Sequence, residues 1–126
     1  MITLASPLSL KRSTKASFIL NMNVYRVSHY RTLNNMKILY KSLMEPQIEK
    51  LPVFDRIHIT YTVYPKTRRL CDVSNVCSIH DKFFCDALVE LGKLSDDNYK
   101  YLPEVVYRFG SVDKDNPRVD ILITPI

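Results

Sequence analysis

The alternation of apolar and polar residues over residues 56–64 restricts the fold of this chain more than any other stretch. Successive side chains of a β-strand point to opposite faces, so this pattern is typical of a strand with one face in the core. The run is rich in β-branched and aromatic residues, which pack well on a pleated surface, and Pro65 ends it. The apolar residues that share the predicted core face are Ile57, Ile59, Tyr61 and Val63.

A helical pattern follows over residues 76–91, where apolar residues fall on one broad arc at about 100° per residue. The polar residues along one edge of this arc are Asn75, Lys82 and Asp86. Asp81 falls well away from that edge. Gly92 stands where a left-handed helix cap is expected. The pattern predicts a helix that packs one side on the core and leaves an edge free to face a site.

Shorter periodic segments surround these two elements. The segments predicted as strands are residues 2–10, 17–20, 105–109 and 118–123, and the segment predicted as a further helix is residues 30–44. Pro46 is expected to end that helix. Residues 11–16 have no apolar period, so residues 1–16 are open to either a first strand or a flexible basic arm.

These elements predict one α+β domain over residues 1–126, in the approximate order β-α-β-α-β-β. The helices are expected to lie on a mixed sheet. The sequence GSVDKDNP at residues 110–117 favours a turn, which predicts a C-terminal hairpin.

Charge and cysteine content limit the setting in which the protein works. A net charge of +5 favours a polyanionic partner. No apolar run approaches the roughly 18 residues that cross a bilayer, and residues 2–10 lack a signal-peptide pattern. We therefore expect a cytoplasmic protein with no membrane partner.

The spacing of Cys71, Cys77 and Cys85 matches neither a zinc pair nor a disulfide framework, which favours reduced thiols packed as small hydrophobes.

Basic side chains gather in three segments that are candidates for DNA contacts. They are Lys11, Arg12 and Lys15; Arg26, His29 and Arg31; and Lys66, Arg68 and Arg69. In the middle segment, which we expect to be a loop, arginine and asparagine can bond phosphate oxygens while tyrosine rings stack on bases. The alternatives are exposed basic loops and, for His29, a bond to the local backbone.

Acidic residues flank the predicted helix. Asp72 follows the predicted strand, and Asp96 and Asp97 follow Gly92. Acids placed in this way can converge in space and hold Mg²⁺, which orients a scissile phosphate and activates water. Lys82 can stabilise the transition state of such a reaction. The alternative is that these residues have no catalytic role. Asp72 would then be an acid in a turn, Asp96 and Asp97 part of an acidic surface loop, and Lys82 a solvated lysine on a helix.

The order and spacing of these residues resemble the RusA family of Holliday-junction resolvases, particularly its phage members. The matching pieces are Arg68, Arg69, the motif Asp72-Val73-Ser74-Asn75, Lys82, Asp86-Ala87-Leu88, Gly92 and the pair Asp96-Asp97. The likeness covers roughly residues 57–123. The chain departs from the family at Ser74, where the family has a second acid, and in a step from Asn75 to Lys82 that is about four residues longer than usual.

The resemblance implies a Mg²⁺-dependent endonuclease that resolves branched DNA as a homodimer, with Mn²⁺ as a substitute metal. It implies that Asp72 and Asp97 bind the metal with Asp96 nearby, that Lys82 contacts the scissile phosphate and that Asn75 positions the loop. The candidates to replace the acid lost at Ser74 are Asp81 and Asp86. The alternatives are a member that binds junctions without cutting them and a protein–protein adaptor with incidental basic charge.

Overall fold

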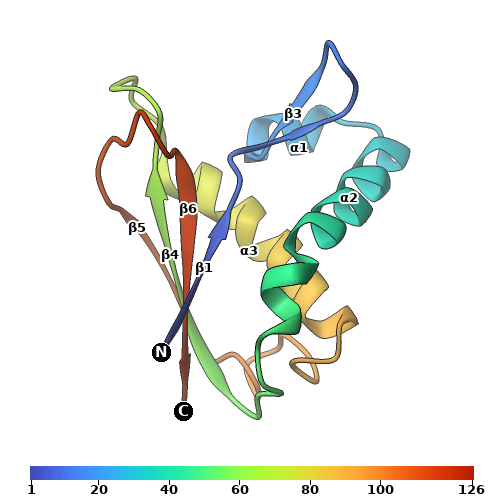
Figure 1. Cartoon of the computed structure of the whole chain (residues 1–126), viewed down its shortest axis with the longest axis vertical. Helices are drawn as coiled ribbons and strands as arrows, with labels where there is room; N and C mark the ends of the chain where they lie inside the picture. The colour runs from blue at the N-terminus through green and yellow to red at the C-terminus, as the bar shows by residue number, and fades with distance from the viewer.

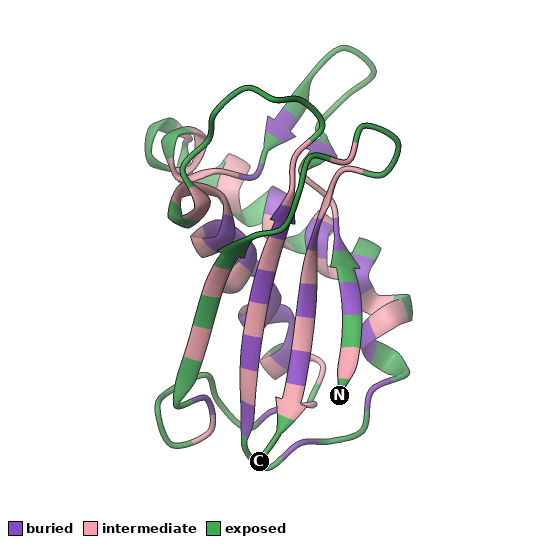
Figure 2. Cartoon of the chain, turned by 90° about the vertical axis from the view of Figure 1, so that its left-hand side faces the viewer, coloured by how far each residue is buried: buried purple, intermediate pink, exposed green.

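The computed structural model describes all of residues 1–126 and has two layers, a β-sheet and helices that cover one of its faces (Figure 1, Figure 2). The elements are β1 (Ile2–Ser6), β2 (Ser9–Lys11), β3 (Ser17–Ile19), α1 (Met22–Val27), α2 (Tyr30–Glu49), β4 (Ile57–Tyr64), α3 (Val73–Glu90), β5 (Glu104–Phe109) and β6 (Arg118–Pro125).

The main sheet confirms the predicted α+β class. Its strand order is β1-β6-β4-β5, in which β4 and β5 are parallel and the other neighbours are antiparallel. Buried and half-buried residues alternate along β4 and β6, and Figure 2 shows this alternation as stripes. The predicted core face of β4 is confirmed, since Ile57, Ile59, Tyr61 and Val63 are all fully buried.

The two C-terminal strands lie where the sequence predicts them, but their pairing differs from a simple hairpin. β5 and β6 do not pair with each other, because each is bonded to one edge of β4. The turn at residues 110–117 therefore crosses over the end of β4. At this crossing the Gly110 amide donates to the Val63 carbonyl (3.0 Å), and a Cβ at Gly110 would lie 2.5 Å from the Tyr64 ring. The turn residues favoured a reversal of the chain, but they did not specify which strand lies between its ends.

The N-terminal segment is ordered into strands, so the alternative of a flexible basic arm is wrong. β1 pairs antiparallel with β6, and its side chains Leu4 and Ser6 are buried. β2 and β3 form a separate hairpin that buries Leu10 and Phe18. The Phe18 ring stacks on Phe83 of α3 at 6.5 Å between centroids, which fixes the hairpin on the helical layer.

The helical layer corrects two further predictions. Residues 22–27, expected in a loop, form α1, which Asn21 caps by accepting from the Val24 amide (2.8 Å). Pro46 lies inside α2 rather than at its end. Pro46 is exposed, so water can satisfy the carbonyl left without a helical donor, while Met44 and Ile48 hold the last turns on the core.

α3 is the central helix, packed between the sheet on one side and α2, α1 and the hairpin on the other. It ends as predicted at Gly92, which has φ of 77°. The Gly92 amide donates to the Val89 carbonyl and the Lys93 amide to the Leu88 carbonyl, which is a Schellman cap. Because α3 runs antiparallel to β4, the segment before α3 and the segment after it lie at opposite ends of the molecule.

Candidate functional site

A polar cavity of about 320 Å³ opens at the first turn of α3, where α1 lies against it. Its lining contains a carboxylate, a guanidinium, two amides and two hydroxyls. The residues of this Asp72 cavity are Met22, Asn23, Arg26, Asp72, Ser74, Asn75 and Ser78. Of the residues predicted from sequence, the fold thus brings together Asp72, Ser74, Asn75 and Arg26.

Asp72 and Asn75 have different surroundings in this cavity. The Asn75 Oδ1 atom accepts from the Met22 amide (3.1 Å), so this side chain joins the first turn of α3 to that of α1. Asp72 occupies the N-cap position of α3 but makes no side-chain capping bond. The Asp72 side chain is exposed and has no hydrogen-bond partner or ion pair. Its carboxylate oxygens are therefore open to a ligand, and the positive end of the α3 dipole favours a negative ligand group nearby.

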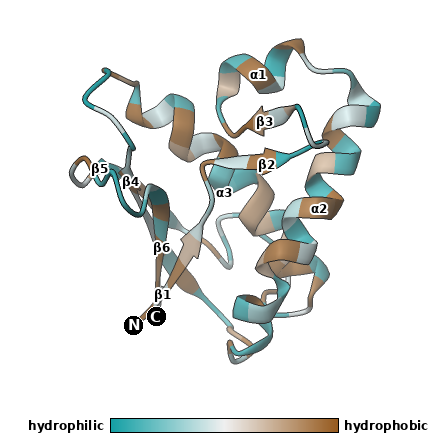
Figure 3. Ribbon diagram, turned by 45° about the horizontal axis from the view of Figure 1, so that its top comes forward, coloured by the Kyte–Doolittle hydropathy of each residue, from teal (hydrophilic) through white to brown (hydrophobic).

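Unpaired basic side chains lie in the Asp72 cavity itself, where Arg26 lines the wall, and in two segments at the same end of the molecule. Lys66, Arg68 and Arg69 lie in the exposed loop between β4 and α3, and Lys11, Arg12 and Lys15 lie at the end and turn of the β2–β3 hairpin. None of these six, nor Arg26, takes part in an ion pair. Figure 3 shows the hairpin beside α1 and α3. Clustered unpaired cations on one end of a protein are the electrostatic pattern of a polyanion-binding surface.

An apolar side chain projects from the same surface. Leu70 follows Arg69 in the loop before α3 and is 97% exposed. Single exposed apolar residues are common on protein surfaces, so it is the position of Leu70 in a basic loop that makes it a candidate for a DNA contact. Some proteins that bend DNA insert apolar side chains between base steps. Leu70 is a residue that the sequence reasoning missed, because exposure of a single leucine cannot be read from its neighbours.

The remaining predicted contacts lie on the outer helices. Lys82 projects from α3 toward α1, with Nζ 5.5 Å from the Tyr25 ring centroid. His29 caps α2 by accepting from the Arg31 amide (3.1 Å), so the backbone role that the sequence left open for it is present. Arg31 lies in the first turn of α2, near the Tyr30 ring.

Asp96 and Asp97 do not converge with Asp72 within one chain. α3 separates them, and its 18 residues at about 1.5 Å each span roughly 27 Å. The Asp96 Oδ1 atom accepts from the Asp97 amide (2.8 Å), which forms a tight acidic turn. Partial burial and a hydrogen bond with Asp96 raise the pKa of Asp97, and the nearby charges of Asp96 and Asp86 act in the same direction. The expected convergence failed because α3 is long and lies between the two acidic segments, which residue spacing alone did not show.

The two candidates to replace the missing acid are committed to other contacts. The Asp81 carboxylate accepts from the Tyr61 hydroxyl (2.8 Å), the Cys85 thiol (3.2 Å) and the Tyr107 hydroxyl (3.0 Å). This Asp81 cluster, formed by Asp81, Tyr61, Cys85 and Tyr107, joins α3 to β4 and β5. Burial and the Asp81 charge raise the pKa of all three donors. Asp86 faces α2 instead and pairs with Lys37 at 3.6 Å.

A second buried polar group on α3 was also missed. His80 is fully buried, and its Nδ1 atom lies 2.6 Å from Ser6 Oγ, which in turn lies 2.7 Å from the Tyr40 hydroxyl. The Nε2 atom of His80 has no partner. Burial lowers the pKa of His80 to about 3, so this ring is neutral near pH 7. No signal in the helical pattern marked His80, because the residues it meets come from β1 and α2.

The donor set of one chain is too small for a complete metal site. No three His, Cys, Asp or Glu side chains gather so as to hold a metal ion. The Asp72 cavity supplies one carboxylate with neutral hydroxyls and amides, whereas Mg²⁺ in enzymes is bound through one or two carboxylates together with water and substrate phosphates. Asp72 therefore fits a metal site to which other groups contribute.

Comparison with known proteins does not extend this picture. No protein-family model matches the chain, and no curated protein matches it. None of its helices combines the length and the hydropathy that a bilayer crossing requires. The fold and the site therefore define the class only as an α+β domain with a basic, polar end around one open carboxylate.

Proposed function

We propose that this protein is a Mg²⁺-dependent endonuclease that binds and cuts branched DNA as a homodimer in the cytoplasm. The observation that carries the proposal is the Asp72 carboxylate, which is exposed and unbonded in a polar cavity that Arg26 lines, directly after a loop that carries the unpaired cations Arg68 and Arg69. Cations of this kind hold phosphates, and a free carboxylate among them is otherwise repelled by the same DNA. A divalent ion between the carboxylate and the phosphate removes that repulsion.

The length of α3 makes the dimer part of the same proposal. If Asp72 and Asp97 ligate the same ion, they must come from different copies, because most of the length of α3 lies between them in one copy. A two-fold dimer with the helices antiparallel brings the first turn of one α3 toward the acidic turn of the other. It also creates two equivalent sites, as needed to cut two strands of a junction.

Within this site each side chain has a role that its surroundings support. A bound Mg²⁺ would polarise the scissile phosphate and lower the pKa of the attacking water. Asn75 holds the first turn of α3 against α1, and Lys82, on the α1 side of α3, can approach a phosphate oxygen. Partial burial is the main cause that raises the pKa of Asp97, and the charges of Asp96 and Asp86 raise it further; a bound cation would oppose this shift.

Leu70 supports branched rather than uniform duplex DNA as the substrate. Its side chain is 97% exposed and follows Arg69 in the loop that leads to Asp72. Insertion of an apolar residue between base steps is easiest where stacking is already interrupted, as at a branch point. We expect Leu70→Ala to lower the preference for a four-way junction over a linear duplex of the same sequence.

Mixing two inactive variants tests the proposal. On a labelled four-way junction with Mg²⁺, Asp72→Asn and Asp97→Asn should each lose more than the roughly 10–100-fold that removal of an outer-shell partner costs. In a mixed dimer, one site lacks both acids and the other retains both. About a quarter of all sites in an equal mixture are then intact, so cleavage should return as single nicks. If both acids of a site belonged to one copy, the mixture would remain inactive.

Several controls separate the outcomes. Asp55→Asn removes an exposed acid at the Asp97 end of the molecule and should leave cleavage unchanged. Chelator should abolish cuts, and Mn²⁺ should restore them. A folded dimer that cuts no branched DNA with either metal would disprove the enzyme. Tight junction binding by such a dimer would favour the second candidate, a branched-DNA-binding module, for which Ser74 in place of an acid is the supporting observation.

A further inference from the structure

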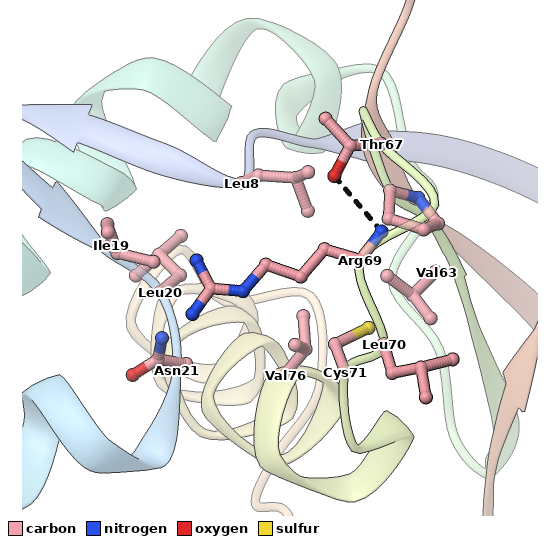
Figure 4. A pocket seen from close by; sticks show the side chains of 11 residues that line it. Leu8, Ile19, Leu20, Asn21, Val63, Thr67, Arg69, Leu70, Cys71 and Val76 are labelled. Carbon is pink, nitrogen blue, oxygen red and sulfur yellow. Dashed lines mark hydrogen bonds between the residues drawn. The ribbon is translucent and has the colours of Figure 1, made fainter. Parts of the chain in front are cut away.

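A second cavity, of about 240 Å³, lies between the base of the β2–β3 hairpin and the loop before α3 (Figure 4). Its walls are mainly aliphatic. The apolar residues of this Arg69 pocket are Leu8, Ile19, Leu20, Val63, Leu70 and Val76. It is separate from the Asp72 cavity, because the two share no lining residue.

The polar groups of the Arg69 pocket offer hydrogen-bond donors that the protein does not use. Figure 4 shows the Arg69 side chain crossing the pocket toward Ile19 and Asn21. Its guanidinium makes no ion pair or hydrogen bond, since the one bond of Arg69 is from its backbone amide to Thr67 (3.3 Å). The Asn21 Oδ1 atom accepts from the Val24 amide (2.8 Å), which leaves the Nδ2 group of Asn21 free.

We infer that the Arg69 pocket receives an unstacked nucleobase from the branched DNA, an inference that rests on the proposed function. A dry cavity of about 150 Å³ accommodates a benzene ring, so the Arg69 pocket has room for a base with its ring substituents. The aliphatic walls contact the faces of the ring. The Arg69 guanidinium and the Asn21 amide can donate to the acceptors along its edge.

The placement of the pocket favours a base over other apolar ligands. Arg68 and Lys66 lie in the same loop as Arg69, so a phosphate backbone held by these two cations would pass close to the pocket. Leu70 lines the pocket as well as projecting from the surface. A side chain that interrupts stacking at a branch would thus stand next to a site that takes up the displaced base.

A fluorescent base analogue tests the inference. With 2-aminopurine at the branch point of a four-way junction, binding should raise its emission several-fold, because the base leaves the stack. The same analogue in the middle of an arm should show no change. Ile19→Trp fills the pocket at an exposed rim position and should abolish most of the rise. It should also weaken junction binding roughly fivefold or more, in line with the loss of one stacked base.

Matched variants keep the outcome interpretable. Val27→Trp adds the same ring at an exposed β-branched residue outside the pocket and should keep the emission rise. Arg69→Ala should reduce the rise while leaving the fold intact, since Arg69 makes no side-chain bond. A rise that persists in Ile19→Trp, or a bound junction that shows no rise at all, would overturn the inference.

The same assay separates this inference from the proposed function. Junction binding with the emission rise but no cleavage would remove the nuclease and leave the base site standing. Binding and cleavage without the emission rise would support the nuclease and remove the base site. A polyglutamate peptide that binds wild type but not Ile19→Trp, with no emission change from any junction, would instead assign the pocket to an acidic peptide and contradict the inference.

Discussion

The first turn of α3 and its middle each carry a carboxylate, and the two differ in what surrounds them. Asp72 is exposed, makes no hydrogen bond and leaves its own helix uncapped. Asp81 is largely covered and accepts from three side chains on α3, β4 and β5. The cations show a related contrast, because those near Asp72 are unpaired whereas Lys37, farther along the helical layer, pairs with Asp86.

This difference separates groups that bind a ligand from groups that stabilise the fold. A side chain that must bind a ligand has to keep its bonding capacity free, which usually costs some stability. One that stabilises the fold has that capacity filled by the protein itself. By this measure the first turn of α3, which begins at the unbonded acid Asp72, is where we propose that a ligand binds. The Asp81 cluster fastens the edge strand β5 to the core.

Removal of each carboxylate should therefore have opposite consequences. Asp81→Ala leaves two hydroxyls and a thiol without an acceptor, and we expect a loss of about 3 kcal/mol in the free energy of unfolding. Asp72→Ala removes no bond and should change stability by less than about 1 kcal/mol, while it abolishes cleavage. Urea unfolding beside the junction assay checks both. Equal losses of stability would erase the distinction between the two acids.

The unpaired cations should show their role in the salt dependence of binding. If Lys66 and Arg68 each contact a phosphate, their double replacement by Ala should lower the magnitude of the slope of log K against log salt by about 1.8. Near 0.15 M salt this corresponds to roughly 30-fold weaker junction binding. Lys50→Ala provides a control, as Lys50 is exposed and unpaired at the opposite end of the molecule. An identical change for Lys50→Ala would mean that the charge acts without a defined surface.

The buried middle of α3 should also set the acid stability. The pKa of His80 falls from 6.5 to about 3 in the folded state, so between these values only the unfolded state binds the proton. Stability is then complete above pH 6.5 and falls by about 1.4 kcal/mol per pH unit below it, down to about pH 3. Unfolding midpoints of wild type at pH 7 and 5.5 measure this. His80→Phe should remove this dependence; if it keeps the same slope, another group is responsible.

Local sequence patterns were enough to predict the elements that pack one apolar face on the hydrophobic core. The alternation in β4 and the glycine after α3 each describe one element, and both were confirmed by the burial of Ile59 and Val63 and by the φ of Gly92. The pattern could not show that β5 and β6 take opposite edges of β4. That choice depends on strand contacts between distant segments, which compete with the local reversal at residues 110–117.

The same limit applies to the site. The sequence pointed to Asp72, Asn75 and the basic loop, and the fold places these residues together. It did not show that α3 separates Asp72 from Asp97, because spacing along a chain does not give direction in space. The donors of the Asp81 cluster were missed since Tyr61 and Tyr107 become neighbours only through the parallel register of β4 and β5.

The smallest expected effect is that of Tyr107→Phe. This variant tests whether the protein itself uses all the bonding capacity of the Asp81 carboxylate. Tyr107→Phe removes the hydroxyl that donates to Asp81 Oδ2, while Tyr61 and Cys85 still donate to Oδ1. We expect a loss of about 1 kcal/mol in the free energy of unfolding, because one acceptor atom loses its protein partner at a partly covered position where water can replace it. Tyr99→Phe removes a hydroxyl from a side chain that is 86% exposed and should have no effect. If Tyr107→Phe is as stable as wild type, Oδ2 does not depend on its bond to the fold. Asp81 would then share with Asp72 the bonding capacity that a metal or a substrate can use, and the contrast between the first turn of α3 and its middle would rest on exposure alone.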